Sequence, residues 1–244
     1  MDEITILSPH RDDAAFSLYL SLSRWSAGKI SLRVVNFFTV SSYAPRVKSQ
    51  DSAVVSSLRG KEDRRVLHSI SKNIQIRSLG LLDAPLRLGI NVSAVCEIML
   101  EEAQSITEAN RLASAIDGYH DGGVVLAPLG LGHHVDHLTV NSAAISCGRL
   151  GRVGFYEDLP YATWTEETAI RERVSEIESK TRVPLKPTII RDRNSVRRKL
   201  RGISHYRSQI THTEAEAIAR FSLKYHGERI WIPKFSGLWN PLIT

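Results

Sequence analysis

Residues 4–25 read ITILSPHRDDAAFSLYLSLSRW, and the pattern changes within one short loop. The first four residues are an apolar run, which is typical of a buried strand. From Asp13 onward the apolar residues recur at helical spacing, so we expect an amphipathic helix to follow at once. His10, Asp12 and Asp13 lie between the two patterns. The stretch therefore predicts a strand and a helix joined by a loop that carries His10, Asp12 and Asp13.

A second polar cluster follows another apolar run. Residues 124–128 read VVLAP, and residues 132–137 read GHHVDH. Strand and helix patterns alternate through the first 150 residues, which predicts an α/β fold, Rossmann-like, with a mostly parallel sheet and helices on both faces. In such sheets ligands bind beyond the carboxyl ends of the strands, where the strand order reverses. We expect strands one and four to be neighbours there, with the two polar loops face to face.

The rest of the chain supplies the other elements. Strands are expected at 32–40, 74–81, 152–156 and 184–190. A helix is expected at 58–70, a second from the cap Ser93 towards Ile116, and a third at 137–147. Thr163 with Glu166 has capping-box spacing for a helix to about 180, and Asn194 or Ser195 would cap a helix through about 209. Residues 41–57 read as a long Ser-rich loop. No linker is evident, so we expect a single domain over 1–244, with a core of about 3–210 and a C-terminal extension, 211–244.

Composition is that of an ordinary globular protein. Apolar residues make up 42% and charged residues 24% of the 244 residues. No apolar run is long enough to span a bilayer, and the acidic start Met1-Asp2-Glu3 is unlike a signal peptide. We therefore expect a cytoplasmic protein with no membrane partner, and the sequence allows a homo-oligomer. Cys96 and Cys147 have no CxxC spacing and are expected to be buried free thiols.

The net charge of +6 has a local source. No aromatic residues interleave with these basic residues as a single-strand binder would require, so we expect a solvated helix face and no nucleic-acid partner. The basic residues concerned are Arg191, Arg193, Arg197, Arg198, Lys199 and Arg201.

The two polar loops carry the ligand types of a catalytic zinc site. His10, Asp13 and His137 would supply two imidazoles and a carboxylate, and leave a position for water. Asp12 would then act as general base, and His134 would stabilise the oxyanion or protonate the leaving amine. Each loop also has an ordinary explanation: an Asp pair before a helix serves as a cap, and loop histidines are often surface residues. The combination of the two clusters at two strand ends favours the metal site.

These residues resemble a known family. The run His10-Arg11-Asp12-Asp13 is similar to the HPDD motif, and His134-Val135-Asp136-His137 to the HxDH motif, of the PIG-L/LmbE-like N-deacetylases. The resemblance extends over about residues 3–210. It implies a zinc enzyme with His10, Asp13 and His137 as ligands, Asp12 as base, and His134 as the electrostatic or acid group. Asp136 would act behind the ligands by fixing an imidazole, and Arg59 and Asp83 would contact the sugar.

The chain departs from the family pattern at three places. Arg11 replaces the usual Pro and Ala14 the usual Glu. Arg11 brings a positive charge that would pair with a carboxylate of the substrate or of the protein. The tyrosine that some relatives carry just before the second motif is absent, and Leu131, Gly132 and His133 fill that segment.

The expected function is zinc-dependent hydrolysis of an amide, with deacetylation of an N-acetylated amino sugar or glycoconjugate as the preferred reaction. Metal-bound water would attack the acetamide carbonyl with Asp12 as general base. These ligands also suit iron. Two alternatives stay open: hydrolysis of a different, non-sugar amide, and a non-catalytic binding protein on the same fold.

Overall fold

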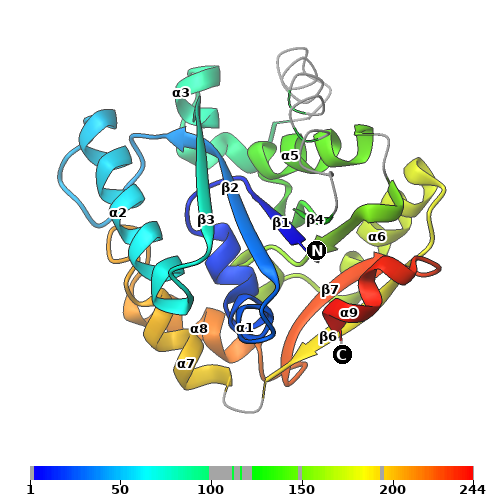
Figure 1. Cartoon of the computed structure of the whole chain (residues 1–244). Helices are drawn as coiled ribbons and strands as arrows, with labels where there is room; N and C mark the ends of the chain where they lie inside the picture. Colours follow the sequence, from blue (N-terminus) through cyan, green and yellow to red (C-terminus); the bar gives the residue numbers. More distant parts are fainter. Residues whose placement is uncertain are drawn as a thin grey trace.

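A seven-stranded sheet runs through the molecule (Figure 1). The computed structural model describes residues 3–98, 112, 116, 123–147, 150–192 and 195–243. The strand order is β3-β2-β1-β4-β5-β7-β6, and β1 to β5 are parallel, whereas β7 is antiparallel to both β5 and β6. The mostly parallel α/β fold is thus confirmed. The strands are β1 Glu3–Ser8, β2 Ser31–Val40, β3 Gln75–Leu82, β4 Val124–Pro128, β5 Val153–Tyr156, β6 Leu185–Arg191 and β7 Gly227–Pro233.

Helices cover both faces of the sheet. In Figure 1, α1, α2, α7 and α8 gather on one side, and α5 and α6 lie on the other. None of the described helices is long and apolar enough to cross a membrane. The α-helices are α1 Asp13–Ala27, α2 Ser52–Ile70, α3 Ala84–Leu88, α5 Val135–Ser146, α6 Glu167–Thr181, α7 Ser195–Ile203, α8 His212–Phe221 and α9 Asn240–Ile243. Short 3-10 helices are η1 Val92–Cys96, η2 Leu131–His133, η3 Leu150–Arg152, η4 Tyr161–Thr163 and η5 Gly237–Trp239.

Strands β1 and β4 are neighbours at the centre of the sheet, as expected. Ile4 pairs with Val124 and Ile6 with Leu126, and these side chains are buried because helices cover both faces. After β1 the chain continues through α1 to β2 on one side, and after β4 through α5 to β5 on the other. The strand order therefore reverses between β1 and β4, and their carboxyl ends open the crevice in which such folds bind ligands.

The C-terminal segment belongs to the sheet and is more than an extension. Strand β7 pairs with both β5 and β6, and Glu228 of β7 reaches helix α1, where its carboxylate accepts the backbone N–H groups of Leu20 and Ser21. Lys199, which we expected on a solvated face, is fully buried and donates to Glu228 at 2.8 Å. A buried ammonium needs such a partner, since desolvation of an unpaired charge is costly.

Some helix boundaries differ from the sequence expectation because side-chain caps decide them. Helix α2 begins at Ser52, since the Asp51 carboxylate accepts the Val54 N–H, so the loop after β2 is shorter than predicted. Asn91 caps η1 instead of Ser93, and the expected helical stretch beyond it lies largely outside the described residues.

The capping box expected at Thr163 does not form. The Thr163 hydroxyl donates to the Pro160 carbonyl, and α6 begins after Glu166. Helix α7 ends at Ile203, before the predicted limit, and position 194 is not among the described residues.

The two thiols differ in their environment. Both cysteines are free; Cys147 is buried as expected, whereas Cys96 is exposed.

Candidate active site

The loop after β1 is held in one shape by its own polar groups. The Ser8 hydroxyl accepts the Ala14 N–H at 3.1 Å, and the Asp13 carboxylate accepts the His10 N–H at 2.7 Å. The Pro9 carbonyl accepts the N–H of Phe38 in β2. These bonds fix His10 and Asp13 beside one another at the start of α1.

The loop after β4 turns on glycine residues. Gly130 and Gly132 have φ of 81° and 72°, the left-handed region in which a side chain is strained. The turn ends at His134, which caps α5 because its Nδ1 accepts the Asp136 N–H at 3.1 Å. His137 consequently lies in the first turn of α5 and faces the β1 loop.

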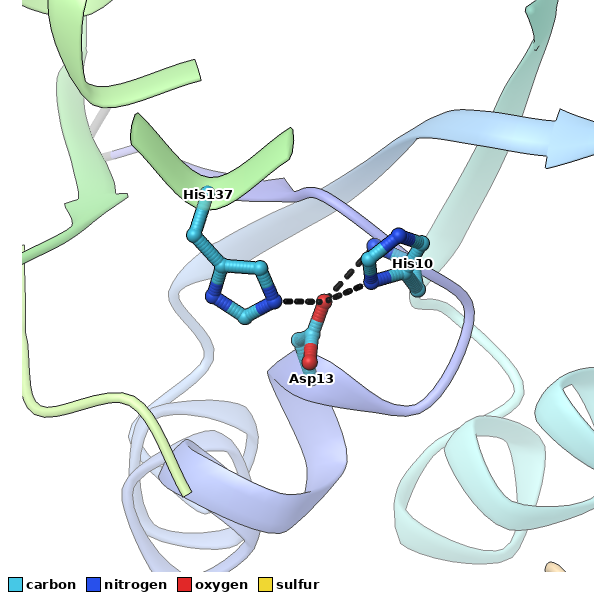
Figure 2. A group of neighbouring side chains, drawn as sticks. All are labelled: His10, Asp13 and His137. Atoms are coloured by element: carbon cyan, nitrogen blue, oxygen red, sulfur yellow. Dashed lines mark hydrogen bonds and ion pairs between the residues drawn. The ribbon is translucent and has the colours of Figure 1, made fainter. Parts of the chain in front are cut away.

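His10, Asp13 and His137 converge on one point, as Figure 2 shows. Asp13 Oδ2 lies 3.3 Å from His10 Nδ1 and 3.4 Å from His137 Nε2. All three ligand atoms lie within 4.8 Å of one another, and the residues are almost fully buried. Two imidazoles and one carboxylate in this arrangement fit a catalytic metal centre that takes three protein ligands.

Two further carboxylates orient the imidazoles from behind. Asp136 Oδ2 lies 3.0 Å from His10 Nε2, and Asp158 Oδ1 lies 2.6 Å from His137 Nδ1. Each carboxylate thereby draws the ring proton to the nitrogen that faces away from the cluster, and leaves the other nitrogen free to bind a metal. The expectation that Asp136 fixes an imidazole matches this geometry.

A second possible ligand group, His10 with His134 and Asp136, is less suitable. Both oxygens of Asp136 are engaged, since Oδ1 accepts from Arg87 at 2.9 Å and Oδ2 accepts the Ala84 N–H at 2.9 Å. His134 Nδ1 is occupied by the cap. Because the two oxygens of Asp136 already serve three hydrogen-bond partners, from His10, Ala84 and Arg87, the first group is the better candidate.

The carboxylates around the cluster stabilise protonated imidazoles, and a bound metal ion would take the place of those imidazole protons. Burial by itself lowers the pKa of His10, but the carboxylates of Asp13 and Asp136 outweigh it and raise that pKa to about 10. The pKa of His137 is also raised against the effect of burial, by Asp13 and Asp158. The same imidazoles overcome the burial of Asp13 and bring the pKa of its carboxyl down to about 2. A metal ion can therefore displace imidazole protons here without leaving the carboxylates unpaired.

His134 is the neutral imidazole of the group. Burial, together with the imidazoles of His10 and His137, lowers its pKa to about 3. Since Nδ1 accepts the Asp136 N–H, the single proton of the neutral ring is on Nε2. His134 can thus donate a hydrogen bond without carrying a charge.

Asp12 lies beside the cluster and is held by Arg59. Arg59 donates to Asp12 Oδ1 at 3.3 Å, to the Ser41 hydroxyl at 3.2 Å and to the Tyr43 carbonyl at 3.3 Å. Arg59 is only 6% exposed, so it is not an ordinary helix-surface charge. Both residues line a cavity of about 330 Å³ that opens over the ligand cluster. Other residues that line this cavity include Asp83, Val92, Val95, Tyr161, Gln209 and Glu214.

Of the residues expected to contact the substrate, Asp83 lines the cavity and Arg11 does not. Asp83 borders the cavity, although its carboxylate also caps α3 by accepting the Leu86 N–H. Arg11 does not line the cavity, because its guanidinium turns away to donate to the Ser78 hydroxyl and packs against Gly60. His133 is exposed and does not border the cavity either.

Sequence reasoning missed Asp158, Arg87 and Tyr161. Asp158 follows β5, the strand next to β4, and its Oδ2 also accepts the N–H groups of Gly130 and Leu131. An acid at the end of the neighbouring strand is a signal that could have identified Asp158. The Tyr161 ring stands edge-on to His137 with a centroid separation of 5.4 Å. No local pattern marks it, since η4 is far from both motifs in the sequence.

Comparisons with known proteins bear on the family and the fold. No family model matches the chain. The chain is 31% identical over 220 residues to 2'-N-acetylparomamine deacetylase of Streptomyces fradiae, covering 84% of this chain and 72% of the relative.

Solved structures share the fold. A deacetylase in complex with teicoplanin has a TM-score of 0.69 at 19% identity, covering 96% of this chain and 99% of its own. N,N'-diacetylchitobiose deacetylase from Pyrococcus horikoshii has a TM-score of 0.57 at 15% identity, covering 98% and 85%. At identities of 19% and 15% these structures show the similarity of fold alone. The family assignment rests on the relative from Streptomyces fradiae. With both motifs brought together at the switch point of the sheet, the chain belongs to the PIG-L/LmbE-like family of N-deacetylases.

Proposed function

We propose that the protein is a zinc-dependent N-deacetylase that acts on an acetylated amino sugar or glycoconjugate. The observation that carries the proposal is the convergence of His10, Asp13 and His137 in a buried cluster at the floor of a cavity, with Asp12 beside them. The relative from Streptomyces fradiae is named for the deacetylation of an acetylated amino sugar, which supports the substrate class.

His10 Nδ1, an Asp13 oxygen and His137 Nε2 would hold the ion. Two imidazoles and a carboxylate are a usual donor set for catalytic zinc, and they also accept iron. When bound, zinc supplies Lewis-acid polarisation of the amide carbonyl and makes water more acidic. Asp136 and Asp158 keep the two imidazoles in the tautomer that this binding requires.

Asp12 is the base in this proposal. Its carboxylate takes a proton from the attacking water as the water oxygen bonds to the amide carbon. Arg59 holds one carboxylate oxygen, so the other stays directed to the reaction. The same proton then passes to the amine nitrogen as the C–N bond breaks, and the products are acetate and the free amine.

His134 stabilises the charge that develops on the carbonyl oxygen. Its neutral ring carries the proton on Nε2, which makes it a donor at neutral pH. A preorganised donor of this kind contributes mainly in the transition state, because the oxygen is more negative there than in the substrate. Asp83 and Arg59 line the cavity and would contact the sugar there.

The test is acetate release by protein reconstituted separately with zinc and with iron. Substrates are 2'-N-acetylparomamine, N,N'-diacetylchitobiose and N-acetylglucosamine. We expect Asp12→Asn to retain the metal and to lose roughly 10²- to 10⁴-fold in turnover, the usual contribution of a general base. Asp51→Asn, which changes an exposed carboxylate at the start of α2, is the matched control.

Two outcomes would contradict the proposal. One is a metal-loaded protein that releases acetate from none of the sugars. The other is full turnover in Asp12→Asn, which would remove Asp12 as the base and leave the amide hydrolase without its proton acceptor.

A further inference from the structure

Aromatic rings lead from the ligand cluster to the protein surface beside the cavity wall. The Tyr161 ring is edge-on to His137 at 5.4 Å, and Trp164 is edge-on to Tyr161 at 5.8 Å and 82°. His137 is 1% exposed, whereas Trp164 is 64% exposed. The three rings therefore form a continuous contact from the buried site to solvent, and Trp164 is its outer end.

The backbone holds this aromatic segment in place. The Trp164 N–H and the Thr165 hydroxyl both donate to the Tyr161 carbonyl, at 3.2 Å and 2.9 Å. Tyr161 also packs directly on Gly132, where a Cβ atom would lie only 2.2 Å from the ring. Because Gly132 comes two residues before His134, this contact fixes Tyr161 against the loop after β4 that carries His134.

An exposed aromatic side chain alone is ordinary in a folded protein. Phe235 is 82% exposed, but it lies in the turn after β7 and does not border the cavity. Trp164 differs because it adjoins the cavity wall through Tyr161. An exposed aromatic side chain that packs against a residue of the cavity wall is a candidate for a binding surface next to that cavity.

We propose that Trp164 is a stacking platform for a second sugar ring, so that the substrate is a glycosylated acetamido sugar and not a free monosaccharide. This inference rests on the proposed deacetylase function. An acetamide at the ligand cluster places its own ring along Tyr161, and a ring linked to it reaches Trp164. Indole offers a large, rigid apolar face with two side-chain torsions, which suits the C–H face of a pyranose at small entropic cost.

Tryptophan fluorescence gives a direct readout of this platform. The chain has four tryptophans, all within the described residues, and Trp25, Trp231 and Trp239 are at most 3% exposed. Acrylamide in solution therefore quenches Trp164 almost alone. We expect N,N'-diacetylchitobiose or 2'-N-acetylparomamine, added to the inactive Asp12→Asn variant, to protect Trp164 from acrylamide, and N-acetylglucosamine to give little protection.

Kinetics provide the second readout. In protein with Asp12 intact, Trp164→Ala should raise KM for the two-ring substrates by about tenfold, as expected for loss of a buried aromatic contact, and leave KM for N-acetylglucosamine unchanged. Trp164→Phe, which keeps an aromatic ring, should raise KM for the two-ring substrates less than Trp164→Ala does. Phe235→Ala is the control for removal of an exposed aromatic ring.

The outcomes separate this inference from the proposed function. If two-ring sugars protect Trp164 but no sugar loses acetate, the platform stands and the proposed function fails. If acetate is released but no sugar protects Trp164 and Trp164→Ala leaves every KM unchanged, the platform is refuted and the deacetylase function stands. Absence of protection by all three sugars also refutes the platform, whatever the activity.

Discussion

Asp158 offers the sharpest test of how the ligand cluster is held, through the variant Asp158→Asn. In the native chain Oδ1 accepts from His137 Nδ1 at 2.6 Å, and Oδ2 accepts the N–H groups of Gly130 and Leu131 at 2.9 and 3.2 Å. Every partner is a donor, and the carboxylate is fully buried. An amide has only one acceptor oxygen, so the side chain of this variant cannot satisfy both sides.

Either orientation of the substituted amide carries a cost. If its NH₂ faces the two backbone amides, buried donors lose their acceptor, which costs about 1–3 kcal/mol of stability. If its NH₂ faces His137, the imidazole must accept at Nδ1 and hold its proton on Nε2, the nitrogen needed for the metal. Loss of a partner behind a metal ligand usually costs about 10- to 100-fold in affinity, or about 1.4–2.8 kcal/mol.

The assay is zinc competition against a chromophoric chelator, combined with urea unfolding of the metal-free protein. Asp63→Asn is the matched control, because Asp63 is also buried and accepts two hydrogen bonds, from Asn36 and Tyr206, away from the ligands. Asp158→Asn with both the zinc affinity and the unfolding free energy of the native protein would refute this account of the cluster.

Three other substitutions test separate features. Arg59→Met should leave zinc content unchanged but destabilise the fold by about 3 kcal/mol in urea unfolding, because it leaves the buried Asp12 carboxylate without its partner. Arg220→Met, which breaks the exposed Arg220–Glu216 pair, should cause a much smaller change, and an equal loss in both variants would contradict this reasoning. Gly132→Ala should lower stability by about 2 kcal/mol or more, since it adds a Cβ in a left-handed backbone against Tyr161; Gly80→Ala, with similar φ but open space, isolates the backbone part, and equal losses in both would contradict the clash. Burial raises the pKa of Asp63 to about 7, so its carboxyl binds a proton more tightly in the folded than in the unfolded chain. Its contribution to stability should be complete below about pH 4 and lost as pH rises through about 7, and Asp63→Asn should abolish that decline between about pH 4 and 7 in urea unfolding.

The central sheet and the meeting of His10, Asp13 and His137 could be predicted because their signals are local. Apolar runs of four to nine residues mark β1, β2 and β4, and the ionisable residues follow β1 and β4 directly. Parallel pairing then brings His10 and His137 together without further information. The rule that ligands bind where the strand order reverses therefore predicted that two loops distant in the sequence lie together.

What could not be predicted depends on partners distant in sequence. Lys199 looks like one of several surface basic residues until Glu228 is placed beside it by β7. Arg11 was expected near the substrate, but its direction is set by the space beside Gly60 and by Ser78. Tyr161 approaches the site because Gly132 leaves room for its ring. Packing of this kind has no signature in the local pattern.

Helix α1, near the start of the chain, depends for part of its stabilisation on residues that follow β6 in the sequence. Helix α1, which carries Asp13, is interrupted at Leu18, where φ is −128°, and the freed amides beyond this kink are bound by Glu228. The indole of Trp25 in the same helix donates to the carbonyl of Leu242. A nascent chain that has emerged only as far as β6 has the metal ligands but lacks both contacts. Helix α1 therefore gains these two stabilising contacts only after residues 227–242 have been synthesised.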